Sequence, residues 1–292
     1  MSAEDDRKSA GSGVVPPAIT VVGELIKTAA HNPSVRAAGG ELGKAAHTIA
    51  KTINIALLPL AAINFGYERA KHYFDENFRP DLEAKLAGLS AEEIVEPKAS
   101  LAGPVLQGLA FTHEEAALKD MYLNLLASAM KRGEATRAHP AFAEVIKQLT
   151  AEEARILLAA LSPPNIKPIA QIRAMHPNGG WTVLLNHVMP ITDSGTNQPV
   201  EEPDLPAMVD NWIRLGLVDI SYVEHLASQP GSNRYEWAQK RPEFERLKSA
   251  HATGPVVAAP GRFSMTAFGS QFAQVVDAQG MFVTALAAPK AQ

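Results

Sequence analysis

Residues 52–67 read Thr-Ile-Asn-Ile-Ala-Leu-Leu-Pro-Leu-Ala-Ala-Ile-Asn-Phe-Gly-Tyr, an uncharged stretch that lies between Lys51 and Glu68. Its apolar side chains cover nearly every face of a helix, and such a helix has to be buried in a core, a partner or a lipid layer. The stretch is shorter than the roughly 20 residues that a helix needs to cross a bilayer. We therefore predict a buried helix of a helical domain, with Pro59 bending or splitting it.

Conditional contact with a membrane or a partner protein is the second interpretation of this stretch. Lys44 and Lys51 precede it, and Arg69 and Lys71 follow it. Cations beside an apolar segment can meet anionic lipid head groups. The candidate contact residues of the segment are Ile53, Ile55, Leu57, Leu58, Leu60, Ile63 and Phe65.

The composition excludes several kinds of site. The chain has 292 residues, a formal net charge of −4 and no cysteine. Without cysteine there is no disulfide, no thiolate nucleophile and no cysteine zinc site. The polar N-terminus lacks the apolar core of a secretion signal, so we expect a cytoplasmic protein. Nucleic acid is an unexpected partner, because binding to phosphates needs a basic surface and the charges here are evenly mixed.

The pattern of apolar residues predicts three parts. Residues 1–13 form a disordered tail, residues 14–148 a helical domain and residues 149–292 a winged-helix-like domain. Helical spacing predicts one helix around residues 19–26 and another from Tyr67 that stops before Pro80.

Two capping boxes mark further helix starts. Thr112 with Glu115 predicts a helix over 112–132, and Thr150 with Glu153 predicts one over 151–161.

The C-terminal part has the order of a winged helix. A helix over 205–215 ends at Gly216, a strand follows over 217–223, a second strand lies at 262–266, and a helix follows over 267–277. The two strands are predicted to pair antiparallel as a small β hairpin. The long insertion between them can form an additional helix near 240–248, and residues 254–261 are predicted as a loop. The fold class is therefore mainly α (α+β).

Several runs carry a resemblance to a known family. These are Lys-Asp-Met-Tyr-Leu-Asn-Leu-Leu-Ala-Ser-Ala-Met at 119–130, His-Pro-Ala-Phe at 139–142 and Gln-Leu-Thr-Ala-Glu-Glu-Ala at 148–154. Together with weaker matches at 215–218 and 265–272, they resemble the bacterial abortive-infection alpha family over roughly residues 53–276. The resemblance implies a role in defence against bacteriophage, and it implies no particular catalytic or binding residue.

A search for chemistry yields one weak candidate. Motifs for nucleotide binding, serine hydrolysis or zinc proteolysis are absent, and no two of the nine histidines share a helix face at metal-ligand spacing. His113, Glu114, Glu115 and Asp120 are the nearest approach to a metal site. We interpret them instead as a helix start that favours negative charge. The prediction is a protein without enzymatic activity, metal or cofactor.

Other conspicuous side chains receive structural interpretations. His139 is expected to cap or pack at a helix start, and Asn124 to make a buried polar contact. Trp181, Trp212 and Trp237 are expected to pack in or around the core.

The predicted function is anti-phage defence through contact. The partner is another protein or a second copy in a homo-oligomer, and membrane perturbation on activation is the specific version of the effector. The alternative is a winged-helix transcriptional regulator that touches DNA through Arg214 and Arg262. In that alternative the helix over 205–215 would read the DNA. Asp204 lies just before this helix and Asp210 lies within it, which opposes the alternative because carboxylates repel phosphates.

Overall fold

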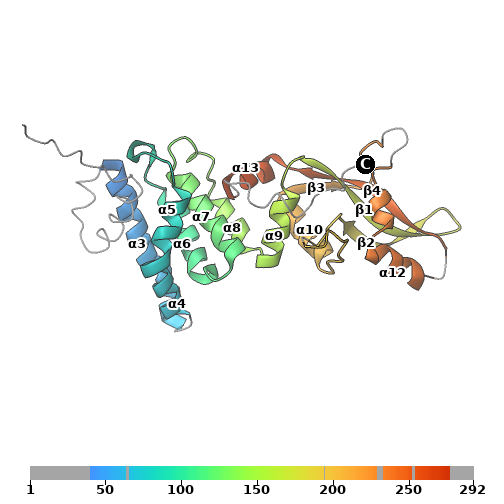
Figure 1. Cartoon of the computed structure of the whole chain (residues 1–292), viewed down its shortest axis with the longest axis horizontal. Coiled ribbons are helices and arrows are strands. Elements are labelled where there is room, and N and C mark those ends of the chain that lie inside the picture. Colours follow the sequence, from blue (N-terminus) through green and yellow to red (C-terminus); the bar gives the residue numbers. More distant parts are fainter. Residues whose placement is uncertain (1–39, 64–65, 194, 229–232, 252–253, 277–292) are drawn as a thin grey trace, which may run out of the picture.

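The computed structural model describes residues 40–63, 66–193, 195–228, 233–251 and 254–276. In Figure 1 these residues form a bundle of helices at one end and a sheet with its own helices at the other. The predicted tail at 1–13 and the predicted helix around 19–26 lie outside the described residues.

The helical end is built from the first half of the chain. Its elements are α3 (Gly40–Ile63), α4 (Tyr67–His72), the π-helix η1 (Tyr73–Asn77), α5 (Phe78–Lys85), the 3-10 turn η2 (Ala91–Glu93), α6 (Ala99–Thr112), α7 (Ala116–Met130), α8 (Ala141–Lys147) and α9 (Ala151–Ala160). Helix α7 is the centre of the bundle, because α6, α8, α9 and α13 (Ala267–Val276) all pack around it. Most of its side chains are therefore buried, from Leu118 to Met130.

Two prolines lie within helices. Pro59 lies inside α3, which is not split there, and the predicted bend at Pro59 stays a prediction. The predicted stop before Pro80 is wrong, because α4, η1 and α5 follow one another without a break from Tyr67 to Lys85. Pro80 is the third residue of α5 and comes directly after η1, where the helix is locally widened to a π turn.

The two predicted capping boxes have opposite outcomes. The box at Thr150 is confirmed, since the backbone N–H of Glu153 donates to Thr150 Oγ1 over 3.1 Å and starts α9. The box at Thr112 is wrong. Thr112 is the last residue of α6, and its hydroxyl donates to the Gly108 carbonyl over 3.0 Å. Helix α7 therefore begins later than predicted, with Glu115 as its N-cap.

The sheet has four antiparallel strands in the order β2-β1-β4-β3. They are β1 (Ile166–Met175), β2 (Trp181–Val188), β3 (Val218–Ser221) and β4 (Val256–Met265). The predicted pairing of the strand after Gly216 with residues 262–266 is confirmed, with Val218 opposite Met265. The sheet is nevertheless larger than the predicted hairpin, because β1 pairs along nearly the whole of β4.

The predicted loop over 254–261 is wrong for the same reason, since most of it belongs to β4. Pro260 is tolerated in β4 because β3 does not reach it. It pairs with Ala170 on the β1 side, and no described strand pairs with it on the other side.

Helices cover the sheet on both faces. One face carries a small apolar cluster in which Ala170 and Ile172 meet Ala238 of α11 (Glu236–Gln239) and Phe244 of α12 (Pro242–Ala250). Helix α12 confirms the additional helix expected near 240–248. The other face joins the main core through Ile169 of β1, Phe263 of β4 and Trp212 of α10 (Leu205–Arg214).

The last helix, α13, returns to the helical end (Figure 1). The amide of Asn124 on α7 donates to the carbonyl of Val276 over 2.7 Å, so both ends of the fold share one core. The boundary near residue 149 and the winged-helix interpretation of the C-terminal part stay predictions.

Candidate functional site

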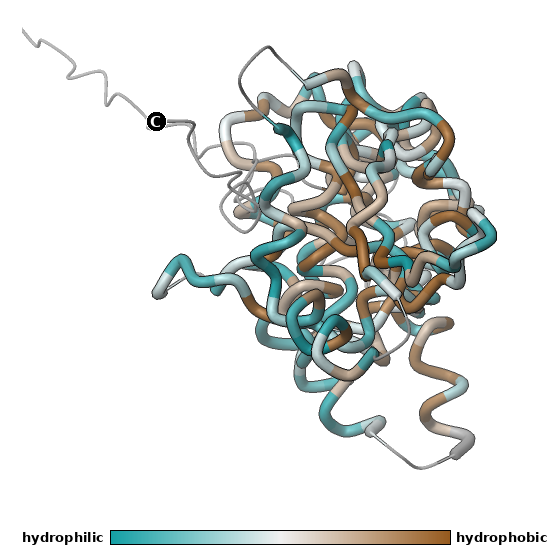
Figure 2. The backbone as a smooth tube through the Cα atoms, turned by 90° about the vertical axis from the view of Figure 1, so that its right-hand side faces the viewer, coloured by the Kyte–Doolittle hydropathy of each residue, from teal (hydrophilic) through white to brown (hydrophobic). Residues whose placement is uncertain are grey.

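Helix α3 has a buried side and an exposed side. Leu57 and Leu60 are buried against the core, whereas Ile55 is 56% exposed and Leu58 is 63% exposed. The prediction that the uncharged stretch is sheltered on all faces is therefore wrong. Among the described residues, helices α6 and α4 and the turn η2 pack against α3 and leave Ile55 and Leu58 exposed. Figure 2 shows the end of α3 as a largely hydrophobic helix.

The other candidate residues of this stretch divide similarly. Ile53 is partly buried and packs against the core. The side chain of Ile63 and the whole of Phe65 lie outside the described part of the structure. Within the described ranges, no helix combines the length and the apolar character that crossing a bilayer requires.

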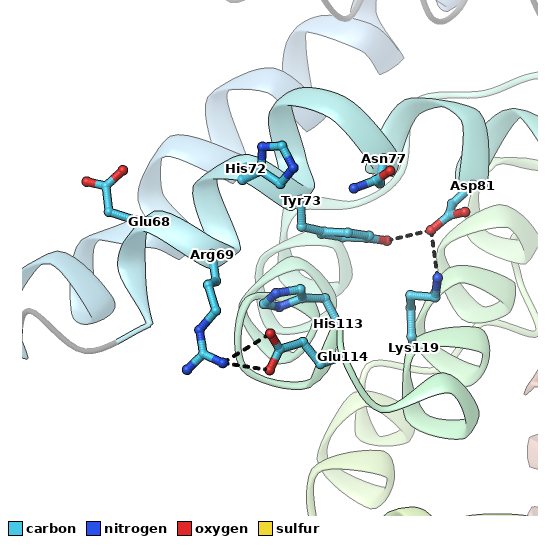
Figure 3. Close-up of a pocket in the computed structure, with 9 residues that line it drawn as sticks. All are labelled: Glu68, Arg69, His72, Tyr73, Asn77, Asp81, His113, Glu114 and Lys119. Carbon is cyan, nitrogen blue, oxygen red and sulfur yellow. Dashed lines mark hydrogen bonds and ion pairs between the residues drawn. The ribbon is translucent and has the colours of Figure 1, made fainter.

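A pocket of about 480 Å³ lies beside η1 (Figure 3). Helix α4, the π-helix, α5, the turn between α6 and α7, and the start of α7 all contribute to it. The lining residues are Glu68, Arg69, His72, Tyr73, Asn77, Asp81, His113, Glu114 and Lys119. A π turn within a helix is rare and is often found at functional sites, so this pocket is a candidate binding site.

One wall of the pocket is a hydrogen-bonded group around Asp81. The Tyr73 hydroxyl donates to the Asp81 carboxylate over 3.2 Å, and the Lys119 ammonium donates to the same oxygen over 3.0 Å. Burial of the phenol is the main reason that the pKa of Tyr73 lies well above its usual range, and the negative charge of Asp81 raises it further. The phenol therefore keeps its proton, and the carboxylate is balanced by a lysine that also lies 5.9 Å from the tyrosine ring centre.

The rim of the pocket is held more weakly. Arg69 pairs with Glu114 over 3.2 Å, and both side chains are exposed, so the pair contributes little stability. His113 stacks on Tyr73 with 5.1 Å between ring centres, as Figure 3 shows. Its Nδ1 atom is buried without a hydrogen-bond partner. The pocket thus offers an easily opened ion pair at its rim to a small polar molecule.

The four residues considered as a metal site contact different partners. His113 stacks on Tyr73, Glu114 pairs with Arg69, and Asp120 pairs with Lys85 over 3.1 Å. No group of three possible metal ligands occurs among the residues that the structure describes.

His139, Asn124 and the tryptophans were expected to have structural roles, and their contacts show which of these roles they have. His139 is a cap, as predicted, because its Nδ1 accepts the backbone N–H of Ala141 over 3.1 Å. Asn124 makes the predicted buried contact. Trp212 is fully buried and Trp237 packs against the smaller apolar cluster, whereas Trp181 is half exposed and lies against Arg173.

The two arginines of the DNA-binding alternative are engaged within the fold. Arg214 donates to Asn211 and to Gln148. Arg262 pairs with Asp219 over 3.2 Å and with Glu224 over 2.9 Å. Two carboxylates beside Arg262 reduce its attraction for phosphate, and the view of nucleic acid as an unexpected partner stays a prediction.

The sequence analysis missed a chain of polar groups around His187. This buried residue has a left-handed backbone with φ of 58°. Its ring Nδ1 lies 2.9 Å from the Tyr222 oxygen, and its Nε2 lies 3.0 Å from Asp210. The network assigns the tautomer: Tyr222 donates to Nδ1, and Nε2–H donates to the carboxylate. No spacing signal could reveal it, because the residues come from β2, α10 and the end of β3.

The stability of the fold is expected to fall with acid through His187. Burial lowers the pKa of His187, and the neighbouring Asp210 opposes this only in part. In the unfolded chain, His187 has its ordinary pKa of about 6.5. Below that pH the unfolded chain therefore binds more protons than the folded chain, and this favours unfolding. We expect His187→Asn, which tolerates the left-handed backbone, to lose less stability than the wild type between pH 7.5 and pH 5.5. Urea unfolding at both values measures this, and equal losses would contradict it.

The comparisons with known proteins give one match. A family model with the description "Abortive infection alpha" matches residues 70–276, which is most of the chain and includes the wall of the pocket. Helix α3 lies before the matched residues. Neither the curated proteins nor the solved structures contain a match.

Proposed function

This chain belongs to the abortive infection alpha family, and we propose that it is a bacterial defence protein against bacteriophage that acts by contact rather than by catalysis. The observation that carries the defence role is the family match over residues 70–276. The family description suggests abortive infection and leaves the mechanism open.

Action by contact is supported by the exposed side of α3. Ile55 and Leu58 are large apolar side chains more than half exposed to water, one helical turn apart. Exposed apolar groups that gather on one face commonly mark a binding surface. In this proposal the helical end is the effector, and its α3 surface meets a partner protein in the cytoplasm. The C-terminal part is a winged-helix-like module that serves protein contact and sensing.

Action without catalysis is supported by the chemistry of the pocket. Tyr73 holds its proton, and Asp81 accepts hydrogen bonds from both Tyr73 and Lys119. A nucleophile is activated by a lowered pKa or by a base that takes its proton, whereas here burial and Asp81 raise the pKa of the Tyr73 hydroxyl. The pocket is better suited to hold a small polar molecule than to transform one.

Membrane perturbation on activation is the specific version of this proposal. Lys51 is exposed before the apolar side chains, and Arg69 and Lys71 are exposed after them. These cations can approach anionic lipid while Ile55 and Leu58 enter the head-group layer.

The proposal predicts that the α3 surface is needed for protection. We expect cells with the wild-type gene to survive phage challenge as a population, and cells with Ile55→Asp and Leu58→Asp combined to lose protection. Both positions are exposed, so the protein should still fold. Val223→Asp is the matched control, because Val223 is 92% exposed near the end of β3. Efficiency of plating measures protection, and circular dichroism checks folding.

The outcomes separate the parts of the proposal. A wild-type gene that protects against no phage in a broad panel would overturn the defence role. Full protection by the folded double variant would overturn the α3 contact while leaving the defence role in place. Dye leakage from anionic vesicles, in infected-cell extract and in buffer, tests the membrane version, which predicts leakage only with extract and only for proteins with Ile55 and Leu58.

A further inference from the structure

Strand β2 forms one edge of the sheet, and no described strand pairs with its outer side. Its sequence, Trp-Thr-Val-Leu-Leu-Asn-His-Val, contains no proline, lysine or carboxylate. Natural edge strands usually carry such residues, because an unprotected edge recruits another strand. The exposed first half of β2 is therefore an unusual edge, and Figure 1 shows the β1–β2 hairpin extending away from the helical end.

The open backbone groups of β2 can be assigned from the register. The His176 N–H donates to the Gly180 carbonyl over 2.8 Å at the turn of the hairpin. Hydrogen-bonded and non-hydrogen-bonded pairs alternate along an antiparallel ladder. Thr182 therefore exchanges its bonds with Ala174, whereas Trp181 and Val183 point their N–H and C=O groups outward.

The same two residues also present apolar side chains. Residues two apart in a strand share a face, and Trp181 is 52% exposed and Val183 41% exposed. The Arg173 guanidinium lies 4.6 Å from the Trp181 ring centre and holds the indole in place from β1. Helices α11 and α12 pack on the opposite face, around Ile172. Open hydrogen-bonding groups and exposed apolar groups thus coincide over three residues.

We propose that a second copy of this chain pairs its β2 with this edge, antiparallel about a two-fold axis through Thr182. In that register Trp181 lies opposite the partner's Val183, and Val183 lies opposite the partner's Trp181. In each of these pairs the two residues exchange two backbone hydrogen bonds, one in each direction. The two pairs together therefore form four backbone hydrogen bonds. The two sheets join into one continuous antiparallel sheet.

The strand is complementary to itself, which is why the occupant is a second copy. A two-fold axis brings the same patch of both subunits together. Here that patch contains an aromatic residue and a β-branched residue two apart, and aromatic with β-branched is a favourable cross-strand pair. Because β2 itself has no charged side chain, the symmetric pairing places no like charges directly opposite each other in the two β2 strands. This dimer does not rest on the defence role and is tested apart from it.

Mass in solution is the first test. We expect light scattering to give twice the chain mass for the wild type and for Val223→Lys, and a single chain mass for Val183→Lys. Both substitutions exchange an exposed valine for lysine, but only one lies on the β2 edge. Val183→Pro is the second variant, because its missing N–H faces outward and the β1 ladder is spared. We expect this variant to fold, by circular dichroism, and to be monomeric.

Cross-linking is the second test, and the absence of cysteine from the chain makes it specific. Thr182 and the partner's Thr182 would form a non-hydrogen-bonded pair with about 4.5 Å between Cα atoms, which a disulfide can span. We expect Thr182→Cys to form a covalent dimer on mild oxidation and Val223→Cys to remain a single chain. A monomeric wild type at high concentration would overturn the proposal. So would a dimer that survives Val183→Lys and lacks the Thr182→Cys cross-link.

Discussion

Replacing Arg241 by alanine is expected to lower the free energy of unfolding by about 3–5 kcal/mol, because it breaks a buried ion pair. The Arg241 guanidinium is buried, and its Nε donates to Glu243 over 2.9 Å. Its two terminal nitrogens donate to the carbonyls of Ile191 and Val200. One side chain therefore fastens the segment after β2 to the start of α12. Alanine would leave a buried carboxylate and two carbonyls without their donor.

The exposed neighbour Arg246 is the matched control. It pairs with Glu201 at the surface, and exposed pairs contribute at most about 1 kcal/mol. Arg246→Ala should therefore be nearly neutral. Urea unfolding of both variants, followed by circular dichroism, makes the comparison. If Arg241→Ala cost no more than Arg246→Ala, the buried pair would not be holding this segment.

Replacing Gly269 by alanine is expected to destabilise the fold by about 1–3 kcal/mol or more. A Cβ at this position would lie 2.0 Å from the Leu217 carbonyl oxygen, which is backbone and cannot move away cheaply. Thr266 sets this close approach, since its hydroxyl bonds the Gly216 carbonyl and accepts the Gly269 N–H over 2.9 Å. Helix α13 thus begins directly against the start of β3.

Gly103 gives a much smaller expected change on the same measurement. It lies within α6, and apart from its chain neighbours a Cβ there would meet nothing within 4 Å. Alanine gains helix propensity, but the following Pro104 disfavours a helical residue with a Cβ before it, so we expect a change below about 1 kcal/mol. A Gly269→Ala variant as stable as the wild type would mean that α13 can shift away from β3.

Features with a local cause could be predicted from the sequence. The Thr150 box starts α9 because its bonds join residues three apart. Gly216 ends α10 with a left-handed backbone, φ of 73°, that few other residues adopt. The pairing of β3 with β4 followed from such signals, and so did the additional helix α12.

The large sheet was not predicted, because its evidence is non-local. Strand β1 pairs with β4 across a long separation in sequence, with Ile166 opposite Ser264. Prolines and glycines around both segments read as loop signals when each is taken alone. The open edge of β2 could not be seen without that sheet. Likewise the pocket brings together Tyr73, His113 and Lys119 from separate helices, and no spacing in the chain joins them.

The sequence by itself determined the start of α9 and the end of α10, which family the chain resembles, and that residues 52–63 are helical and largely apolar. Local hydrogen bonds and backbone preferences act within a few residues, so the order of residues is enough to specify them. Only the tertiary structure decided which side of α3 is covered. A helix that is apolar all round has no preferred face of its own, and the position of α6 and α4 leaves Ile55 and Leu58 in water.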